Sequence, residues 1–559
     1  MANSINKRRS RKEASGQRFG WLLALGCALV ATICGLLAVA SFFVTATGAL
    51  GAGFSEYVSF HLPSTPKWVL EFAAAFAVMT LYLLAVVRLV RHADKVREGR
   101  FVAILAVLAL TFCTWWIFDS ATAYNGFADS RQLTQYAQEL ARGDYSSFLP
   151  RSEAFASRLP GDMYLSNYPF QAGILLVFEG YFRLFGDKAI EAYQFTNAIA
   201  SVGSGLALIG MAHLVGASKR ERLVTELLAL TFVPPLVFCV FPYGNALGLA
   251  LCLFAMLAWM KSQTLEGVHA LPHILLGAVL LFCGFVAKST YVVIAIGFVL
   301  VLAIDSIRKS SWWHAPLIVV LLVIASKAAG LIPATIMESR LGVEFPENQP
   351  KTMWIAMGLN TGDVFGDSMP GWWSGFALES QIRNEGDVAA QAKEAEGAIG
   401  QAVTRFASDP AYAAWFFSKK LGTEWLDPTF QSLYIASIGI MTPEEVARGT
   451  IAPDGRYDAW DTSFVHGWVS RVLFAVMDGM QTVIYAGTAI GTVELLRQAR
   501  DKSRTLAYCL PCAFFMGFVV YVLWEAKGMY AMPFFFCLIP VAAQGLTKLA
   551  QHKWGHQPA

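Results

Sequence analysis

The sequence has few charged residues for its length. Asp, Glu, Lys and Arg make up 15% of the 559 residues, against roughly 25% in soluble domains, while 56% are hydrophobic. A chain of this composition carries too much apolar surface for a water-exposed fold and needs a bilayer. The formal net charge is only +3, and its basic residues cluster in short connecting segments. We therefore expect no nucleic-acid partner.

The sequence also lacks cysteines outside its apolar stretches, and it lacks metal-binding motifs. All nine cysteines fall within apolar stretches, so we expect no disulfide framework. No His pair is spaced i, i+4 beside an acid, and there is no Asp-rich loop. The sequence patterns therefore assign no metal ligands and no cofactor.

Long apolar runs are abundant. A run of about twenty residues crosses a bilayer as a helix, and about twelve such runs predict an all-α integral membrane protein. They lie near residues 19–48, 67–91, 101–119, 192–216, 223–242, 244–261, 272–288, 290–304, 315–337, 465–496, 505–524 and 530–547. The first follows a basic segment, residues 7–12, and resembles an uncleaved signal anchor.

Basic residues set the expected orientation. If the amino terminus is cytoplasmic and the spans alternate, every basic cluster falls on the cytoplasmic side, as the positive-inside rule requires. This holds only if residues 169–185 do not cross. In that short stretch Gln171, Glu179 and Arg183 recur on one helical face, which predicts an interfacial helix on the outer leaflet. Both termini are then cytoplasmic, and two long polar stretches, 120–191 and 338–464, lie outside with juxtamembrane helices.

The first outer stretch carries a series of short motifs. It runs from Tyr124-Asn-Gly-Phe-Ala-Asp129 through Arg142-Gly-Asp144 and Tyr168-Pro-Phe to Leu184-Phe-Gly186. This order resembles the first extracytoplasmic loop of GT-C glycosyltransferases such as protein O-mannosyltransferases and lipid A aminoarabinose transferases. The closest resemblance is to sparsely characterised members in Gram-positive bacteria, which implies a multi-pass protein of the bacterial plasma membrane.

Later segments resemble the same group. Gly284-Phe-Val-Ala-Lys288 is similar to its lysine-containing turn between two spans, and Trp354-Ile-Ala-Met-Gly358 and Trp425-Leu-Asp-Pro428 are similar to parts of its second loop. Trp524-Glu-Ala-Lys527-Gly-Met529-Tyr resembles the segment before its last span, except that Met529 stands where Arg is usual. Lys527 is then the candidate to replace that Arg.

The resemblance covers residues 110–547 and divides the chain into four segments. Residues 1–100 form a basic amino terminus and two additional spans, and 101–337 form the GT-C-like core with the first outer loop. Residues 338–464 form the second outer loop, and 465–559 form the last spans and a cytoplasmic tail. The resemblance implies a polyprenyl-phosphate sugar donor and an acceptor that is an envelope glycan, a lipid or a protein. Some members use a divalent cation and others do not.

Transfer of this kind requires a base for the acceptor hydroxyl. Asp129 follows the third span by about ten residues, near the outer surface, and is the general-base candidate; as an alternative it starts a helix. Asp144 and Glu179 are further acidic candidates near the acceptor. Asp144 follows Gly143 and also fits a turn, and Glu179 also fits a solvated helix face.

The leaving phosphate requires cationic groups. Lys288 interrupts apolar sequence at an outward turn, where an unpaired cation is costly, and Lys527 lies on another outward turn beside Glu525. Both are phosphate-binding candidates, with snorkelling to the interface as the alternative for Lys288.

Two other functions remain open. A lipid-linked sugar flippase or transporter predicts charged residues along several spans and short loops on both sides. A polysaccharide polymerase or ligase predicts arginines that act in the large outer loop, where Arg340, Arg383, Arg405, Arg448 and Arg456 are scattered.

Overall fold

The computed structural model describes residues 2–50, 56–119, 128–149, 164–309, 313–342, 344, 347–361, 369–437 and 467–554. The protein is an all-α polytopic membrane protein. Among the described residues, eleven helical stretches are long and apolar enough to cross a membrane, or twelve if the bent pair Gly528–Phe536 and Ile539–His552 forms one span. The predicted fold class and the estimate of about twelve spans are confirmed.

The spans begin and end close to the predicted apolar runs. Where two prolines follow one another at 234 and 235, the fifth predicted run divides into two helices, because proline cannot donate the backbone hydrogen bond that would continue the first. The last run is bent by 56° between its two helices. The helices are α1 (Ala2–Phe43), α2 (Pro66–Arg91), α3 (Glu98–Asp119), α8 (Ala189–Leu214), α9 (Lys219–Thr231), α10 (Val233–Val237), α11 (Asn245–Ser262), α12 (Leu271–Ala287), α13 (Val292–Lys309), α14 (His314–Leu341), α22 (Trp468–Gln498), α23 (Cys509–Leu523), α24 (Gly528–Phe536) and α25 (Ile539–Trp554).

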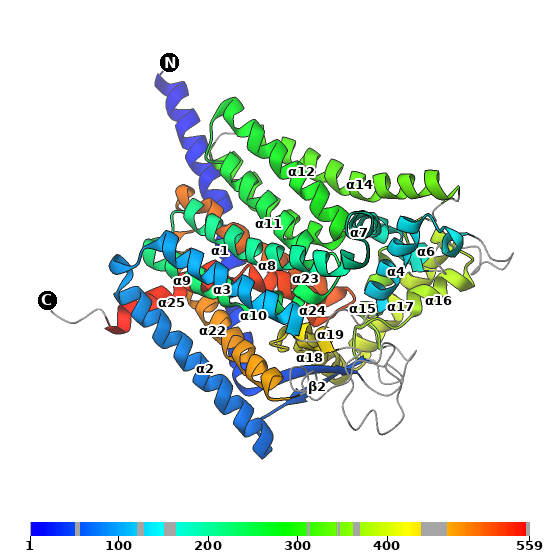
Figure 1. Ribbon diagram of the computed structural model, residues 1–559. Helices are drawn as coiled ribbons and strands as arrows, with labels where there is room; N and C mark the ends of the chain where they lie inside the picture. Colours follow the sequence, from blue (N-terminus) through cyan, green and yellow to red (C-terminus); the bar gives the residue numbers. More distant parts are fainter. Residues whose placement is uncertain are drawn as a thin grey trace.

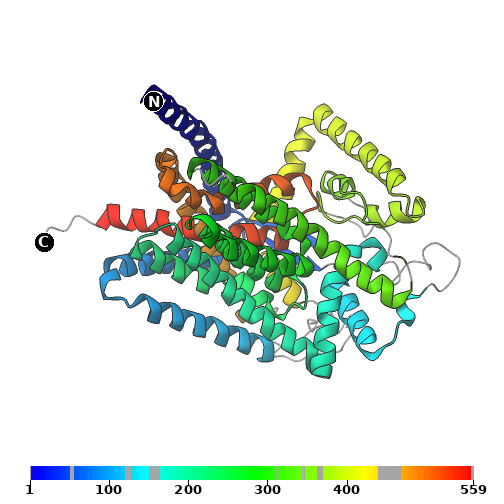
Figure 2. The same ribbon diagram turned by 90° about the horizontal axis from the view of Figure 1, so that it is seen from above.

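The remaining helices gather at one end of the bundle. We call this the loop end, and the opposite end, where α1 begins and α25 ends, the termini end (Figures 1 and 2). The loop end carries α4 (Ala128–Arg142), α6 (Tyr164–Asn167), α7 (Ala172–Phe185), α15 (Thr352–Gly358), α16 (Phe376–Arg383), α17 (Val388–Ser408), α18 (Pro410–Trp425) and α19 (Ser432–Ser437).

Helix α7 does not continue the direction of α8. Figure 1 views α7 along its axis, whereas α8 runs across the picture. Residues Pro169–Leu214 form one apolar stretch of 46 residues, but Gly186, with φ +55°, ends α7. The expectation of a solvated polar face on this helix is wrong for Gln171 and Glu179, which are buried because α7 packs against α4, α8 and α14. The Arg183 side chain is 54% exposed.

A short β-hairpin follows the first span at the loop end. Strands β1 (Thr45–Leu50) and β2 (Glu56–His61) pair antiparallel, with Thr45 opposite His61. The predicted first span was therefore too long, since α1 ends at Phe43. The backbone N–H of Ala46 donates to the carbonyl of Leu426 at 3.0 Å. This bond attaches the amino-terminal addition to the helices of the second long stretch.

Burial separates inner from outer spans. In the most apolar part of each span, 83% of the residues are buried for Lys219–Val240, but only 17% for Pro66–Arg91 and 22% for His314–Leu341. The surfaces of α2 and α14 nevertheless remain apolar, as expected for helices whose backbone polar groups are satisfied internally and whose side chains face lipid. Helices α2 and α14 are therefore outer spans of the bundle.

The arrangement predicts the accessibility of the two ends. Glu396 in α17 at the loop end and Glu266 in the connection before α12 are both exposed. With the basic connections inside, a membrane-impermeant maleimide added to intact cells should label Glu396→Cys but not Glu266→Cys. Permeabilised cells, in which both sites should react, are the control, with the unsubstituted chain as baseline. Labelling of Glu266→Cys alone in intact cells would reverse the orientation.

Candidate active site

Two predicted residues from distant segments meet on one tyrosine at the loop end. Asp129 lies in the first turn of α4, and Lys288 follows the last residue of α12. Between them is Tyr243, in the connection that leads into α11. Its hydroxyl donates to Asp129 Oδ2 at 3.2 Å, and Lys288 Nζ lies 4.3 Å from the centroid of its ring. The structure thus brings an acid and a cation to opposite parts of the same side chain.

Gly244 makes this meeting possible. A Cβ atom at this position would lie 1.8 Å from the backbone carbonyl oxygen of Ala287, which no side chain can tolerate. Only glycine allows the connection before α11 to lie directly against the end of α12. Tyr243 precedes Gly244, and Lys288 follows Ala287. The close approach of these two backbone segments therefore sets the distance between the Tyr243 and Lys288 side chains.

The tyrosine hydroxyl has a fixed hydrogen-bonding direction. The Gln171 side-chain amide donates to the Tyr243 oxygen, so the tyrosine's own proton is directed to Asp129. Burial, and then the negative charge of Asp129, hold the pKa of Tyr243 well above its usual range. The tyrosine therefore stays protonated, and its hydroxyl orients the Asp129 carboxylate by donating a hydrogen bond to it.

Lys288 lies between negative charges and aromatic rings. Burial lowers its pKa to about 8, and the charges of Asp129 and Glu525 oppose that shift. Its ammonium also lies 5.9 Å from the ring centroid of Tyr530, the second aromatic face it meets. Lys288 is thus mainly cationic near neutral pH and loses its charge as the pH rises through about 8.

Glu525 reaches this site on the turn between α23 and α24. It is buried, and two neighbouring backbone N–H groups hold the turn: that of Glu525 donates to the carbonyl of Trp354, and that of Ala526 to the carbonyl of Gly371, each at 2.9 Å. Both acceptors belong to the second long stretch. The turn is therefore positioned by a segment that precedes it by more than 150 residues.

A fully buried lysine fastens the same turn. Lys420 in α18 donates to the carbonyls of Gly358, Val522 and Trp524 at 2.6, 3.0 and 2.8 Å, which uses all three of its donors. Two of these carbonyls belong to the carboxyl-terminal end of α23, where a helix leaves acceptors unsatisfied. Burial lowers the Lys420 pKa to about 8. Lys420 thereby connects α15, α18 and the Glu525 turn.

The other predicted site residues contact other groups. Lys527 follows Glu525, but its ammonium lies 5.4 Å from the Trp372 ring centroid. Asp144 is exposed and accepts from the backbone N–H of Ser146 at 2.9 Å, the turn arrangement that was the alternative for this residue.

Glu179 holds two helices together. Arg340, near the end of α14, donates to both of its carboxylate oxygens at 2.7 Å, and Arg183 donates to one of them at 2.9 Å. A bidentate pair of this kind is strong and directional, and it satisfies a carboxylate that is 4% exposed. Glu179 therefore connects α7 to α14, with its oxygens already occupied.

Sequence reasoning missed Tyr243 and Lys420. The signal for Tyr243 was present: Pro242-Tyr243-Gly244 interrupts apolar sequence at an outward connection, as Lys288 does. Lys420 gave no such signal, because a lysine in a polar loop is normally solvated. Only packing shows that it is enclosed.

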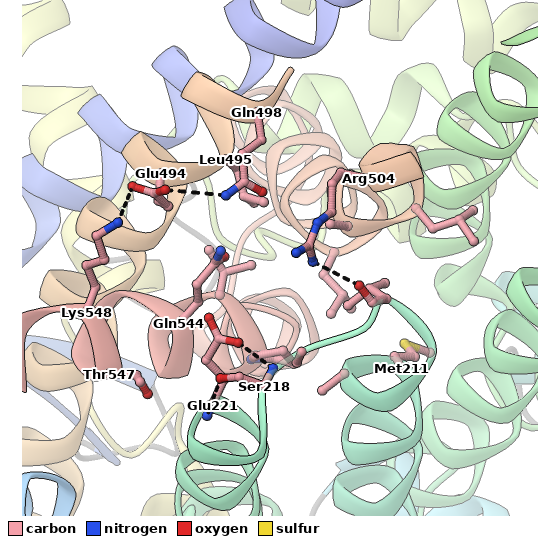
Figure 3. A pocket seen from close by; sticks show the side chains of 18 of the residues that line it. Met211, Ser218, Glu221, Glu494, Leu495, Gln498, Arg504, Gln544, Thr547 and Lys548 are labelled. Carbon is pink, nitrogen blue, oxygen red and sulfur yellow. Dashed lines mark hydrogen bonds and ion pairs between the residues drawn. The ribbon is translucent and has the colours of Figure 1, made fainter. Parts of the chain in front are cut away.

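A separate pocket lies at the termini end of the bundle, and Figure 3 shows the side chains that line it. Its volume is about 240 Å³, and it is formed where α8 ends, α9 begins, and α22 and α25 pass. Several polar side chains in it are paired: Lys548 with Glu494 at 3.1 Å, and Arg504 with the carbonyl of Val215 at 3.2 Å. We call Asp129, Tyr243, Lys288 and Glu525 the Tyr243 cluster. The span Lys219–Val240 separates this pocket from that cluster.

Comparisons with known proteins give one structural likeness. No family model matches the chain, and no curated protein does. The crystal structure of the Archaeoglobus fulgidus oligosaccharyltransferase in the apo form is similar over 81% of this chain, with a TM-score of 0.40 and 11% sequence identity. The match spans about half, 51%, of that chain's length. Evidence on function therefore comes from the site geometry and the sequence motifs.

The close approach at Gly244 can be tested through stability. Gly244→Ala forces a Cβ into the Ala287 carbonyl, so we expect the free energy of unfolding to fall by about 1–3 kcal/mol or more, as for an overpacked core. Thermal unfolding of the purified protein in detergent measures this. Gly180→Ala in α7 is the matched control, because nothing lies within 4 Å of its Cβ position. Equal melting temperatures for both variants would contradict the argument.

Proposed function

We propose that this chain is a membrane glycosyltransferase of the GT-C type, which moves a sugar from a polyprenyl-phosphate donor to an extracytoplasmic acceptor. The observation that carries the proposal is the meeting of Asp129 and Lys288 on Tyr243 at the loop end. The order of sequence motifs supports it, because the motifs that resemble the family supply both residues. The acceptor is an envelope glycan, a lipid or a protein.

Asp129 is proposed as the general base. An acceptor hydroxyl is too weakly acidic to attack without transferring its proton, and a positioned carboxylate can take it. The hydroxyl of Tyr243 binds one oxygen of Asp129 and so fixes its orientation. Because α4 lies at the loop end (Figure 1), the carboxylate is near both the aqueous phase and the surface of the bilayer.

Lys288 is proposed to stabilise the leaving phosphate. Negative charge develops on the phosphate as the bond to the anomeric carbon breaks, with inversion, and a preorganised cation lowers that barrier. The ammonium lies over the tyrosine ring, away from the hydroxyl that contacts Asp129. Base and cation are thereby separated by one aromatic ring. Lys527, at the next turn, is proposed to contact the donor more distantly.

The membrane placement completes the proposal. The loop end is assigned to the outer side of a bacterial plasma membrane and both termini to the cytoplasm, because the basic connections lie at the termini end. A lipid-linked donor presents its phosphate at the membrane surface, where the turns that carry Lys288 and Lys527 lie. In the flippase alternative, charged side chains would line a path across the spans; the described pair Glu98–Arg222 lies instead in the first turns of α3 and α9, and Arg340 lies near the end of α14.

Replacement of the base is the sharpest test. Asp129→Asn keeps the size of the side chain and still accepts from Tyr243, but it cannot take a proton. Transfer from a synthetic polyprenyl-phosphate sugar by the purified protein should fall by about 10²- to 10⁴-fold, while donor binding and melting temperature stay close to wild type.

Asp144→Asn is the matched control for this substitution. Asp144 is an exposed aspartate only fifteen positions along the chain and lies in a turn, so we expect full transfer activity. Near-normal turnover by Asp129→Asn would remove Asp129 from the mechanism and reduce it to a residue of the first helical turn.

The Lys288 pKa predicts how transfer depends on pH. Since the pKa is lowered to about 8, the cationic fraction falls as pH rises through that value, and the rate should fall with it. The groups that face the ammonium are Asp129, Glu525, Tyr243 and Tyr530, and both acids favour its charged form. A rate profile from pH 6 to 10 measures the decline.

Two substitutions separate charge from packing. Lys288→Met keeps similar apolar volume and should be slow at every pH, without the decline near pH 8. Lys288→Arg keeps its charge throughout this range, so any remaining activity should persist to higher pH. If Lys288→Met transfers sugar like the wild type, Lys288 only snorkels to the interface.

A further inference from the structure

Three spans bring metal-ligating side chains together at the termini end. Glu98 is the first residue of α3, His213 lies in the last turn of α8, and Glu226 lies in α9. One ligand atom from each of the three lies within 4.8 Å of the other two. His213 Nε2 and Glu98 Oε1 are 2.9 Å apart, close enough to share one proton or one ion. The part of the α9–α10 span that follows Glu226 lies between this group and the Tyr243 cluster.

Glu226 is the residue that requires a partner. It is 0% exposed, and none of the described residues contributes an N–H donor to its carboxylate oxygens. Its neighbour in the group is another carboxylate, that of Glu98. Two carboxylates come together in a buried place only when a proton or a cation lies between them, because an unpaired buried charge is costly.

Arg222 does not remove this requirement. Its guanidinium binds both oxygens of Glu98, with Nε at 2.7 Å from Oε1 and Nη2 at 2.8 Å from Oε2, and its Nη1 donates to the carbonyl of Ala217. The arginine is thus committed to orienting Glu98, as hydrogen-bonded partners orient metal-ligating carboxylates. One guanidinium then faces two carboxyl groups and the imidazole of His213.

We propose that Glu98, His213 and Glu226 bind one divalent transition-metal cation. One imidazole nitrogen and two carboxylates form a donor set that suits Zn²⁺ or Mn²⁺ better than Ca²⁺ or Mg²⁺, which prefer oxygen ligands alone. The cation joins the first turn of α3, the last turn of α8 and the middle of α9, and so clamps three spans on the side opposite the Tyr243 cluster. This role is structural and does not depend on the proposed transfer reaction.

Metal analysis of the full-length protein tests the site. After purification in detergent without chelators and with any affinity tag removed, we expect about one equivalent of zinc or manganese per chain. Removal of the ion by EDTA should lower the melting temperature, and added ZnCl₂ or MnCl₂ should restore it, because a ligand that binds only the folded state stabilises it. Both readouts are independent of enzymatic activity.

Variants locate the ion. Glu226→Gln and His213→Gln should each weaken metal binding by more than about 100-fold, and the melting temperature should no longer respond to EDTA. His213→Gln is the safer variant for folding, since that side chain is 49% exposed. Glu266→Gln, which changes an exposed acid at the same end, is the control and should retain the metal.

A protein without bound metal would contradict this proposal. If the wild type carries no metal and its melting temperature does not change with added ZnCl₂ or MnCl₂, a shared proton joins Glu98 and Glu226 instead. Metal that persists in both Glu226→Gln and His213→Gln would equally exclude this site.

Discussion

Exclusion of charge and unpaired backbone groups from the bilayer interior is the constraint on which the rest of the structure depends. It requires helical spans with apolar surfaces and moves ionisable side chains toward the two ends. Each connection between spans then becomes a place where polar residues can gather. The cluster at the loop end is composed of residues from such connections, Tyr243, Lys288 and Glu525, and it is assembled by the packing of turns against one another.

Burial gives these few polar groups their properties. Lys288 and Lys420 have lowered pKa values for the same reason, loss of water, but their surroundings differ. Lys420 donates all its hydrogens to three backbone carbonyls and is committed to holding a turn. Lys288 faces aromatic rings and acids, which leaves its charge available to a ligand. Lys420 therefore has a structural role, whereas Lys288 is suited to a chemical one.

The two ends of the bundle differ in the same way. At the loop end the acid and the cation are separated by an aromatic ring, so an acceptor and a phosphate could each find a partner. At the termini end Glu98, His213 and Glu226 converge within a few ångströms, an arrangement for a compact ion. Neither set of contacts joins residues close in sequence. Both depend on close helix packing, which at Gly244 allows two backbones to meet where no side chain would fit.

The sequence by itself determined the spans, the distribution of basic residues between the ends, and Asp129 and Lys288 as candidates, because apolar length and isolated charge are local properties of the chain. It gave no sign that Glu179 pairs with Arg340 161 positions away, or that Glu98, His213 and Glu226 from three spans lie together. Tertiary structure decided these points, and the place of Tyr243 between Asp129 and Lys288. The reason is physical: the partners of a buried polar group are chosen by packing between distant segments, and no local pattern records that choice.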